Sequence, residues 1–206
     1  MKLLKKLIAL DIICFLVFTF ILVEVLANRV LINSDISINL LMSLVKNNLI
    51  IDISKLIGVI FDTLSIVVIS LILLIYFWFK YSKKDSLFFM LVILLSTGLI
   101  FLVKELVQRA RPFNALVSET SFSFPSGHAT SAVVFFGLLI YLFIIKNKSF
   151  LSRSLFTLIC FILILIIGFS RLILNVHWFS DVIGGFFLGL FILISCVIIR
   201  EILNKG

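Results

Sequence analysis

Long apolar runs are the feature of this sequence that most restricts its fold. A helix that crosses a lipid bilayer needs about 20 mainly apolar residues. Strands of a membrane barrel would alternate polar and apolar residues, and these runs do not alternate. The sequence therefore predicts an all-α, polytopic membrane protein, a bundle of six transmembrane helices. The predicted spans are Leu7–Ala27, Ile57–Phe79, Ser86–Val107, Ala129–Ile145, Leu155–Leu172 and Trp178–Ile199.

The composition excludes several other classes of protein. Hydrophobic residues make up 63% of the 206 residues and charged residues 14%, whereas soluble domains are about 45–50% apolar and about 25% charged. A soluble chain of this length could not bury so many apolar side chains, and a disordered segment would be far more polar. Cys14, Cys160 and Cys196 lie inside apolar runs without a C-x-x-C pattern. We therefore expect buried thiols rather than a disulfide scaffold.

The chain is predicted to form a single integral-membrane domain over residues 1–206, because it has no internal repeat or low-complexity tract. Its longest connection, Asn28–Leu56, mixes polar and apolar residues. This segment is either an ordinary loop or, in part, a helix lying flat at the membrane interface. Lys2–Lys6 and the apolar residues after them are also compatible with a cleavable signal peptide. We favour a retained span, because the apolar region continues for the length of a transmembrane helix.

The positive charges indicate the orientation of the chain. A net charge of +8 would suggest nucleic-acid binding in a soluble protein, but here the cations stand mainly between apolar runs. Lys and Arg are more frequent in the connections on the side of both termini, such as Lys80–Lys84 and Lys146–Arg153, than on the other side. Because cytoplasmic connections carry this excess, we expect a cell-membrane protein with cytoplasmic termini and no nucleic-acid partner.

Three polar clusters then fall at the outer ends of the predicted helices, where we expect the functional site. In the first cluster, Lys104 and Arg111 are seven residues apart, which is two helical turns and the same face. Pro112 should end the helix at Arg111. Arg109 points to the opposite side at about 100° per residue and is interpreted as an interfacial or topological charge. Taken alone, Lys104 and Arg111 could also be cations that snorkel at the membrane edge.

The second cluster is the segment Pro125-Ser126-Gly127-His128. Ser126 can cap a helix that begins near His128, and Gly127 lets a ligand approach the backbone closely. A helix N-terminus with free N–H groups is a site for an anion. The alternative is an ordinary loop.

The third cluster contains Ser170-Arg171, His177 and Asp181. His177 and Asp181 are four residues apart, which places them on one face of a helix. The carboxylate can bind the protonated ring nitrogen and leave the other nitrogen free as a nucleophile. The alternative is a polar pair that only stabilises a helix end.

Together the three clusters predict a phosphate pocket. Lys104, Arg111 and Arg171 supply three cations for an anion, and the two histidines of the chain fit one nucleophile and one proton donor. A metal site is the main chemical alternative. Its candidate ligands are crowded by these cations, so we predict no metal and no cofactor. The candidate ligands are His128, His177, Asp181, Glu105 and Glu119.

These motifs resemble those of the type-2 phosphatidic acid phosphatase superfamily, which includes membrane lipid-phosphate phosphatases and the related vanadium haloperoxidases. Lys104-x6-Arg111-Pro112, Pro125-Ser126-Gly127-His128 and Ser170-Arg171-x5-His177-x3-Asp181 match its three signature parts in the expected order. Haloperoxidases share the pocket but are large and soluble, so we do not expect that activity.

The resemblance implies a metal-independent mechanism. His177, oriented by Asp181, would attack phosphorus and form a phosphohistidine. His128 would protonate the leaving oxygen and then activate water. The remaining residues of the motifs would hold the phosphate oxygens, namely Lys104, Arg111, Ser126, the Gly127 amide and Arg171.

The same resemblance suggests a lipid phosphate or pyrophosphate as the substrate. Undecaprenyl pyrophosphate is the first choice on that ground, with phosphatidylglycerophosphate and phosphatidic acid as alternatives. Two other classes of function stay open. A transporter would use Asp11, Glu24 and Asp62 along a path, although all three are expected near span ends, where interfacial placement is simpler. A catalytically silent membrane protein is the second alternative.

Overall fold

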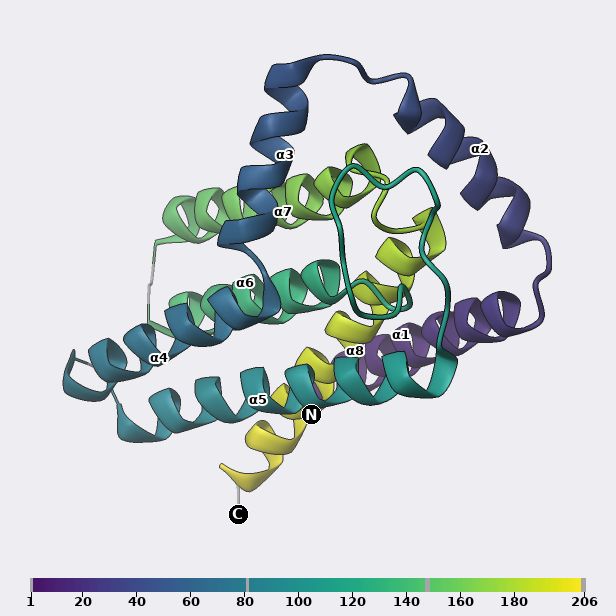
Figure 1. Cartoon of the computed structure of the whole chain (residues 1–206). Coiled ribbons are helices and arrows are strands. Elements are labelled where there is room, and N and C mark those ends of the chain that lie inside the picture. Colours follow the sequence, from purple (N-terminus) through teal and green to yellow (C-terminus); the bar gives the residue numbers. More distant parts are fainter. Residues whose placement is uncertain (1, 81, 147–148, 205–206) are drawn as a thin grey trace.

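The computed structural model describes residues 2–80, 82–146 and 149–204, and over these residues the chain is helical, without strands. Figure 1 shows the path of the chain. The helices are α1 (Lys2–Leu26), α2 (Leu31–Ser43), α3 (Asn48–Ile60), α4 (Thr63–Lys80), α5 (Lys83–Val107), α6 (Gly127–Lys146), α7 (Phe150–Ile173) and α8 (Phe179–Leu203).

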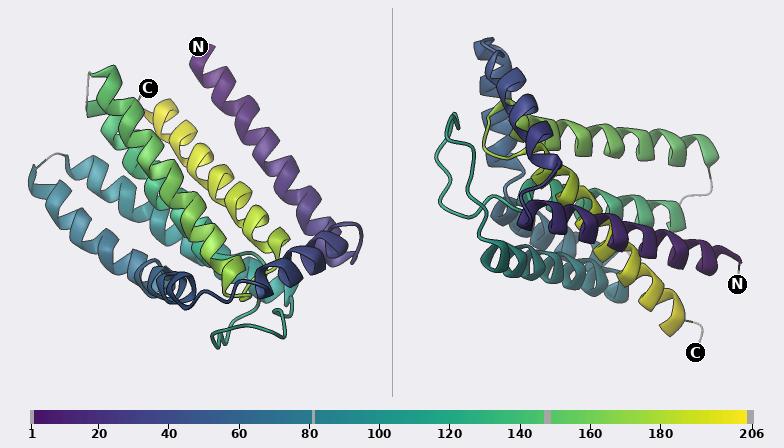
Figure 2. Two further views of the ribbon diagram at one scale, coloured as in Figure 1. Left: turned by 90° about the horizontal axis from the view of Figure 1, so that it is seen from above. Right: turned by 90° about the vertical axis from the view of Figure 1, so that its right-hand side faces the viewer.

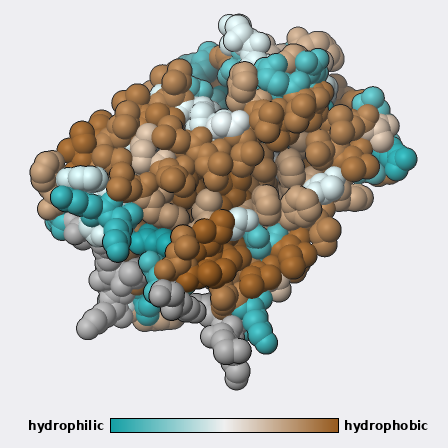
Figure 3. Space-filling model, turned by 90° about the horizontal axis from the view of Figure 1, so that it is seen from below, coloured by the Kyte–Doolittle hydropathy of each residue, from teal (hydrophilic) through white to brown (hydrophobic). Residues whose placement is uncertain are grey.

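Six of these helices, α1 and α4 to α8, are long and apolar enough to cross a membrane. This confirms the predicted all-α class and the six spans. Large apolar side chains are exposed along their outer faces, among them Phe20, Phe79 and Phe101. Figure 3 shows apolar residues covering the middle of one face of the molecule, with hydrophilic residues mostly toward its margins. Such a surface is stable in hydrocarbon, and in water it would aggregate.

The predicted second span, Ile57–Phe79, is wrong at its beginning. The helix is interrupted between Ile60 and Thr63. Residues Ile57–Ile60 therefore belong to α3, and the membrane span itself is α4. The Leu64 N–H donates a hydrogen bond of 3.1 Å to the Asp62 carboxylate. A carboxylate at this position satisfies a free N–H group in the first turn of a helix, and this explains why α4 begins here.

The connection between residues 28 and 56 is mainly helical, since it contains α2 and most of α3 rather than an ordinary loop. In Figure 2 both helices lie at one end of the bundle, and the two chain termini lie at the other. Two buried residues attach α2 to the end of the bundle. The Asn39 side chain donates to Asn175 over 2.8 Å, and Asp35 accepts hydrogen bonds from Ser180.

Helices α6 and α8 pack with their backbones very close together. A Cβ added at Gly185 would lie 2.8 Å from the carbonyl oxygen of Ser126, and one at Gly189 would lie 2.9 Å from that of Thr130. Small residues four apart permit this approach between membrane helices. The approach brings the second motif, at the beginning of α6, beside the third motif, at the beginning of α8.

Helix α1 packs against α8 through buried residues that include Cys14. The three predicted buried thiols, Cys14, Cys160 and Cys196, are indeed buried and free. Asp11 was expected near the end of its span, but it lies well inside α1, where both carboxylate oxygens accept from the Ser195 hydroxyl of α8 at 3.0 Å. This partner satisfies a carboxylate that would otherwise be costly in hydrocarbon. Retention of the first span stays a prediction.

Candidate active site

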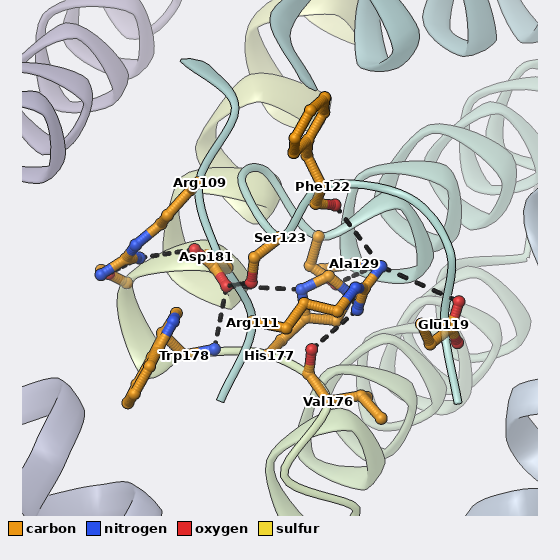
Figure 4. Close-up of polar contacts among 12 residues, drawn as sticks. Arg109, Arg111, Glu119, Phe122, Ser123, Ala129, Val176, His177, Trp178 and Asp181 are labelled. Carbon is orange, nitrogen blue, oxygen red and sulfur yellow. Dashed lines mark hydrogen bonds and ion pairs between the residues drawn. The ribbon is translucent and has the colours of Figure 1, made fainter. Parts of the chain in front are cut away.

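All three sequence motifs meet at the end of the bundle opposite the termini. Lys104 lies in the last turn of α5, His128 in the first turn of α6, Arg171 in the last turn of α7 and Asp181 in the first turn of α8. Figure 4 shows the polar contacts that join part of this cluster. The predicted convergence at one set of helix ends is therefore present in the fold.

The predicted His177–Asp181 pair is formed, but around the beginning of a helix rather than along one. His177 precedes α8, and the extended backbone of Trp178 is the cap of that helix. His177 Nδ1 lies 3.4 Å from Asp181 Oδ2. The same oxygen accepts from the Trp178 N–H over 2.9 Å and from the Ser123 hydroxyl. Several donors therefore hold the carboxylate in place, as required of a group that orients an imidazole.

The other nitrogen of the His177 ring faces a cation. Its Nε2 lies 3.3 Å from Arg111 Nη1. Burial lowers the pKa of His177 to about 3, against the opposing effect of Asp181, and the nearby Arg111 and Lys104 lower it further. The ring is therefore neutral near pH 7. Because the ionised Asp181 can only accept, Nδ1 carries the proton, and the lone pair of Nε2 faces the Arg111 N–H, which can only donate.

Lys104 and Arg111 meet on the loop that precedes α6. Lys104 donates to the Phe122 carbonyl oxygen and, over 3.2 Å, to the Ser121 hydroxyl. Arg111 donates to the carbonyl oxygens of Ser121 at 2.8 Å and Val176 at 2.7 Å. Burial lowers the pKa of Arg111 from its usual value. Carbonyl and hydroxyl oxygens of the protein therefore hold both cations in place in this structure.

The route by which these two cations meet differs from the prediction. Helix α5 ends at Val107, because Gln108 adopts a left-handed conformation with φ of 49°. Arg111 therefore lies beyond the helix, and the seven-residue spacing does not describe a common helix face. The loop, rather than helix periodicity, brings Arg111 to Lys104.

His128 and Arg171 form a second group of contacts, against α3. Arg171 Nη1 lies 3.3 Å from His128 Nε2, and Arg171 Nη2 donates to the Ser54 carbonyl oxygen over 3.1 Å. His128 Nε2 lies 2.9 Å from the Gly58 carbonyl oxygen, which can only accept, so this nitrogen carries the proton. His128 and Arg171 line a cavity of about 490 Å³ together with Glu119 and Asp62.

Ser126 and Gly127 occupy the beginning of α6 as predicted. The Ser126 hydroxyl oxygen accepts from the Ala129 N–H at 3.4 Å, which is the expected capping bond. The space beside Gly127, where a ligand was expected, is approached by the Thr63 side chain. A Cβ added at Gly127 would lie 3.1 Å from Thr63 Oγ1. In this structure the Ser126 hydroxyl oxygen therefore caps the helix that it begins.

The interpretation of Arg109 as an interfacial charge is wrong. Its Nη1 donates to Asp181 Oδ1 over 2.5 Å and its Nη2 to Asp35 Oδ2 over 2.6 Å. The helical angle that placed it on the opposite side does not apply, because the chain has already left the helix at Gln108. Asp35 and Ser123 could not be predicted as part of this site, since neither belongs to a recognisable motif.

The candidate metal ligands do not gather into a site. Over the residues that the structure describes, no three His, Cys, Asp or Glu side chains lie close enough together to hold a metal ion. The charged side chains around His177 and Asp181 include the cations Lys104, Arg109 and Arg111. Metal-free chemistry stays a prediction that rests on this charge arrangement.

Comparison with known proteins identifies the family of this chain. A model of the PAP2 superfamily matches residues 85–205, which include all three motifs. The chain belongs to the PAP2 superfamily. Membership confirms the resemblance drawn from the motifs.

Two matches from Bacillus subtilis, one in sequence and one in structure, extend this comparison. The curated protein "Phosphatidylglycerophosphatase B" of strain 168 is 40% identical over 116 residues, which are 54% of this chain and 57% of that protein. The match therefore spans less than two thirds of that relative. The crystal structure of a transmembrane PAP2-type phosphatidylglycerolphosphate phosphatase aligns with a TM-score of 0.84 and 28% identity, over 93% of this chain and 96% of the other. The likeness confirms the fold of a multi-pass membrane protein.

Proposed function

We propose that this protein is a lipid-phosphate phosphatase that works through a phosphohistidine on His177. The observation that carries the proposal is the position of the neutral His177 ring between Asp181 and Arg111, with Nδ1 toward the carboxylate and Nε2 3.3 Å from the guanidinium. A phosphate bound by Arg111 would draw this N–H away from Nε2 and present its phosphorus to the Nε2 lone pair. Membership of the PAP2 superfamily supports this assignment.

Phosphatidylglycerophosphate is the substrate that we favour. Both Bacillus subtilis matches described above carry names that refer to this lipid phosphate, and the site lies at the ends of membrane-spanning helices, where a lipid head group is accessible. Undecaprenyl pyrophosphate, the first choice from the sequence, rests on the motif resemblance alone and takes second place, together with phosphatidic acid.

In the first step, His177 Nε2 would form a bond to phosphorus while the bond from phosphorus to the lipid oxygen breaks. His128, protonated beside the bound phosphate, would give its proton to that oxygen. Asp181 would hold the Nδ1 proton and stabilise the positive charge that develops on the ring. The N–H groups of Lys104, Arg111 and Arg171 would turn from carbonyl oxygens to the phosphate and stabilise the transition state.

In the second step, His128 would take a proton from water, and the oxygen of that water would attack phosphorus. The bond between phosphorus and Nε2 then breaks, inorganic phosphate leaves and His177 is neutral again. Three cations supply the charge stabilisation that metal ions provide in other phosphatases, so the cycle needs no metal.

We propose that residues 1–206 act as one catalytic domain in the cell membrane. The site and the two termini lie at opposite ends of the bundle (Figure 2). Because Lys and Arg are in excess on the side of the termini, that side would be cytoplasmic. The site would then face the extracytoplasmic side. The contacts of Asp11 with Ser195 and of Asp62 with α4 give no support to the transporter alternative.

A phosphate-release panel tests the proposal. Purified protein is assayed in detergent with phosphatidylglycerophosphate, phosphatidic acid and undecaprenyl pyrophosphate, beside a His177→Gln variant. We expect the highest kcat/KM for phosphatidylglycerophosphate and no release by the variant. A higher kcat/KM for undecaprenyl pyrophosphate would reassign the substrate, and a wild-type protein that releases phosphate from none of the three lipids would contradict the function.

A further inference from the structure

We propose that Asp35, on α2, is a positioning residue for this reaction and acts on His177 through Arg109 and Asp181. The inference rests on the proposed phosphatase function. Asp35 lies outside the three motifs, in a connection whose structure the sequence left open. It touches neither histidine and would not touch the substrate.

The contacts of Asp35 are complete and buried. Its side chain is only 2% exposed. Oδ1 accepts from the Ser180 N–H at 2.8 Å, and Oδ2 accepts from the Ser180 hydroxyl at 2.7 Å and from Arg109 Nη2 at 2.6 Å. A buried carboxylate with three donors is held in one geometry, because losing any of them would leave it poorly compensated.

Arg109 carries this constraint to the nucleophile. Its Nη1 donates to Asp181 Oδ1 over 2.5 Å, while Asp181 Oδ2 faces His177 Nδ1 at 3.4 Å. Arg109 also lies over the Trp178 ring, 5.7 Å from its centroid. Figure 4 shows Arg109 and Ser123 on opposite sides of Asp181. The groups form a continuous chain from the nucleophile to α2, in the order His177, Asp181, Arg109 and Asp35.

The charges along this chain give Asp35 an electrostatic effect beyond packing. Arg109 alone would neutralise Asp181 and weaken its support for the positive charge that the ring gains during attack. The Asp35 carboxylate offsets Arg109, so that the three charged groups keep a net charge of −1 beside the ring. In a buried site such a charge is weakly screened. Asp35 should therefore favour phosphorylation of His177 without changing the binding of the phosphate.

The Asp35→Asn variant removes this charge and keeps the size of the side chain and an oxygen for Ser180. We expect the rate of phosphohistidine formation, measured by rapid acid quench, to fall roughly ten- to a hundredfold, by analogy with the loss of a group that orients a metal-binding histidine. KM should change by less than about twofold, because ground-state binding is unaffected. Asp35→Glu, which restores the charge, should recover part of the rate.

Two further variants distinguish a positioning role of Asp35 from a purely structural one. Glu105→Gln removes an exposed carboxylate of α5 and should keep the wild-type rate. In an Asp181→Asn background, Asp35→Asn should cost less than about twofold more, because its effect passes through Asp181. An effect of equal size in both backgrounds, or a wild-type rate in Asp35→Asn, would overturn the inference. A wild-type protein that forms no phosphohistidine would instead contradict the proposed function.

Discussion

Arg111 Nη1 lies 3.3 Å from His177 Nε2, on the edge of the ring that is remote from Asp181. A protonated ring would place two cations in contact inside a buried site, so the neutral form is favoured. Burial, with a smaller effect of Arg111, lowers the pKa of His177 to about 3 against the opposing effect of Asp181.

This arrangement predicts how stability depends on pH. In the unfolded chain His177 takes up a proton below about pH 6.5, whereas the folded protein does not until about pH 3. The contribution of His177 to stability is therefore full above about pH 6.5 and is lost as the pH falls from there. Thermal unfolding in detergent should show the Tm of wild type falling relative to His177→Gln between about pH 7 and about pH 4.5. A Tm difference that does not change with pH would contradict the neutral ring.

The role of His128 is tested by the leaving group of the substrate. Replacement by Gln should lower kcat for a lipid phosphate by roughly 10²- to 10⁴-fold, the usual contribution of a general acid. An alkyl-substituted 4-nitrophenyl phosphate has a leaving group that needs no proton, so its release in the first turnover, before His128 acts as the base, should fall much less. His177→Gln is the control, because loss of the nucleophile stops both substrates. Equal losses for both leaving groups in the first turnover would exclude His128 as the acid.

Gly58→Ala is expected to impair the reaction without unfolding the protein. The new Cβ would lie 2.3 Å from Arg171 Nη2, and the flexible guanidinium can move away. A displacement of about 1 Å at a catalytic group can cost about 10² in rate, so kcat/KM should fall clearly while Tm stays near wild type. Gly98→Ala is the matched control, since a Cβ there meets nothing within 4 Å. Unchanged kcat/KM in Gly58→Ala would show that the position of Arg171 does not matter.

In contrast to Gly58→Ala, the substitution Gly185→Ala is expected to lower the stability of the protein. Its Cβ would lie 2.8 Å from the Ser126 carbonyl oxygen and 3.0 Å from the Ala129 Cβ, and the backbone cannot move aside as a side chain can. Such overpacking costs typically about 1–3 kcal/mol. The Tm in detergent should therefore fall, and Gly98→Ala again serves as the control. A Tm equal to wild type would mean that α6 and α8 separate more easily than their packing suggests.

Removal of metal ions should leave the activity unchanged. Lys104, Arg111 and Arg171 are the groups expected to balance the charge of the phosphate, so chelation by EDTA should not lower phosphate release. Vanadate, which mimics the pentacoordinate phosphorus, should inhibit. Activity that is lost in EDTA and restored by magnesium would contradict the proposed mechanism.

Some features could be predicted because they depend on short stretches of sequence. An apolar run of about 20 residues specifies a membrane helix wherever it occurs, so the spans that became α5, α6 and α8 needed no knowledge of their neighbours. The motif residues from Lys104 to Asp181 could also be recognised, because their types and spacings match those of a known family. The failures came where backbone conformation changed, as at Asp62, where Ile57–Phe79 divides, and at Gln108, after which the helical angle misplaced Arg109.

By itself, then, the sequence determined the solvent of the protein, its helical class and the residues that carry its proposed chemistry, since hydropathy and motif spacing are local properties. Only the tertiary structure decided which groups act on one another. Asp35 reaches Arg109 because α2 folds onto the end of α8, and Gly58 faces Arg171 because α3 packs on α7. Contacts between segments so distant in the chain depend on packing, and packing is set by the whole bundle.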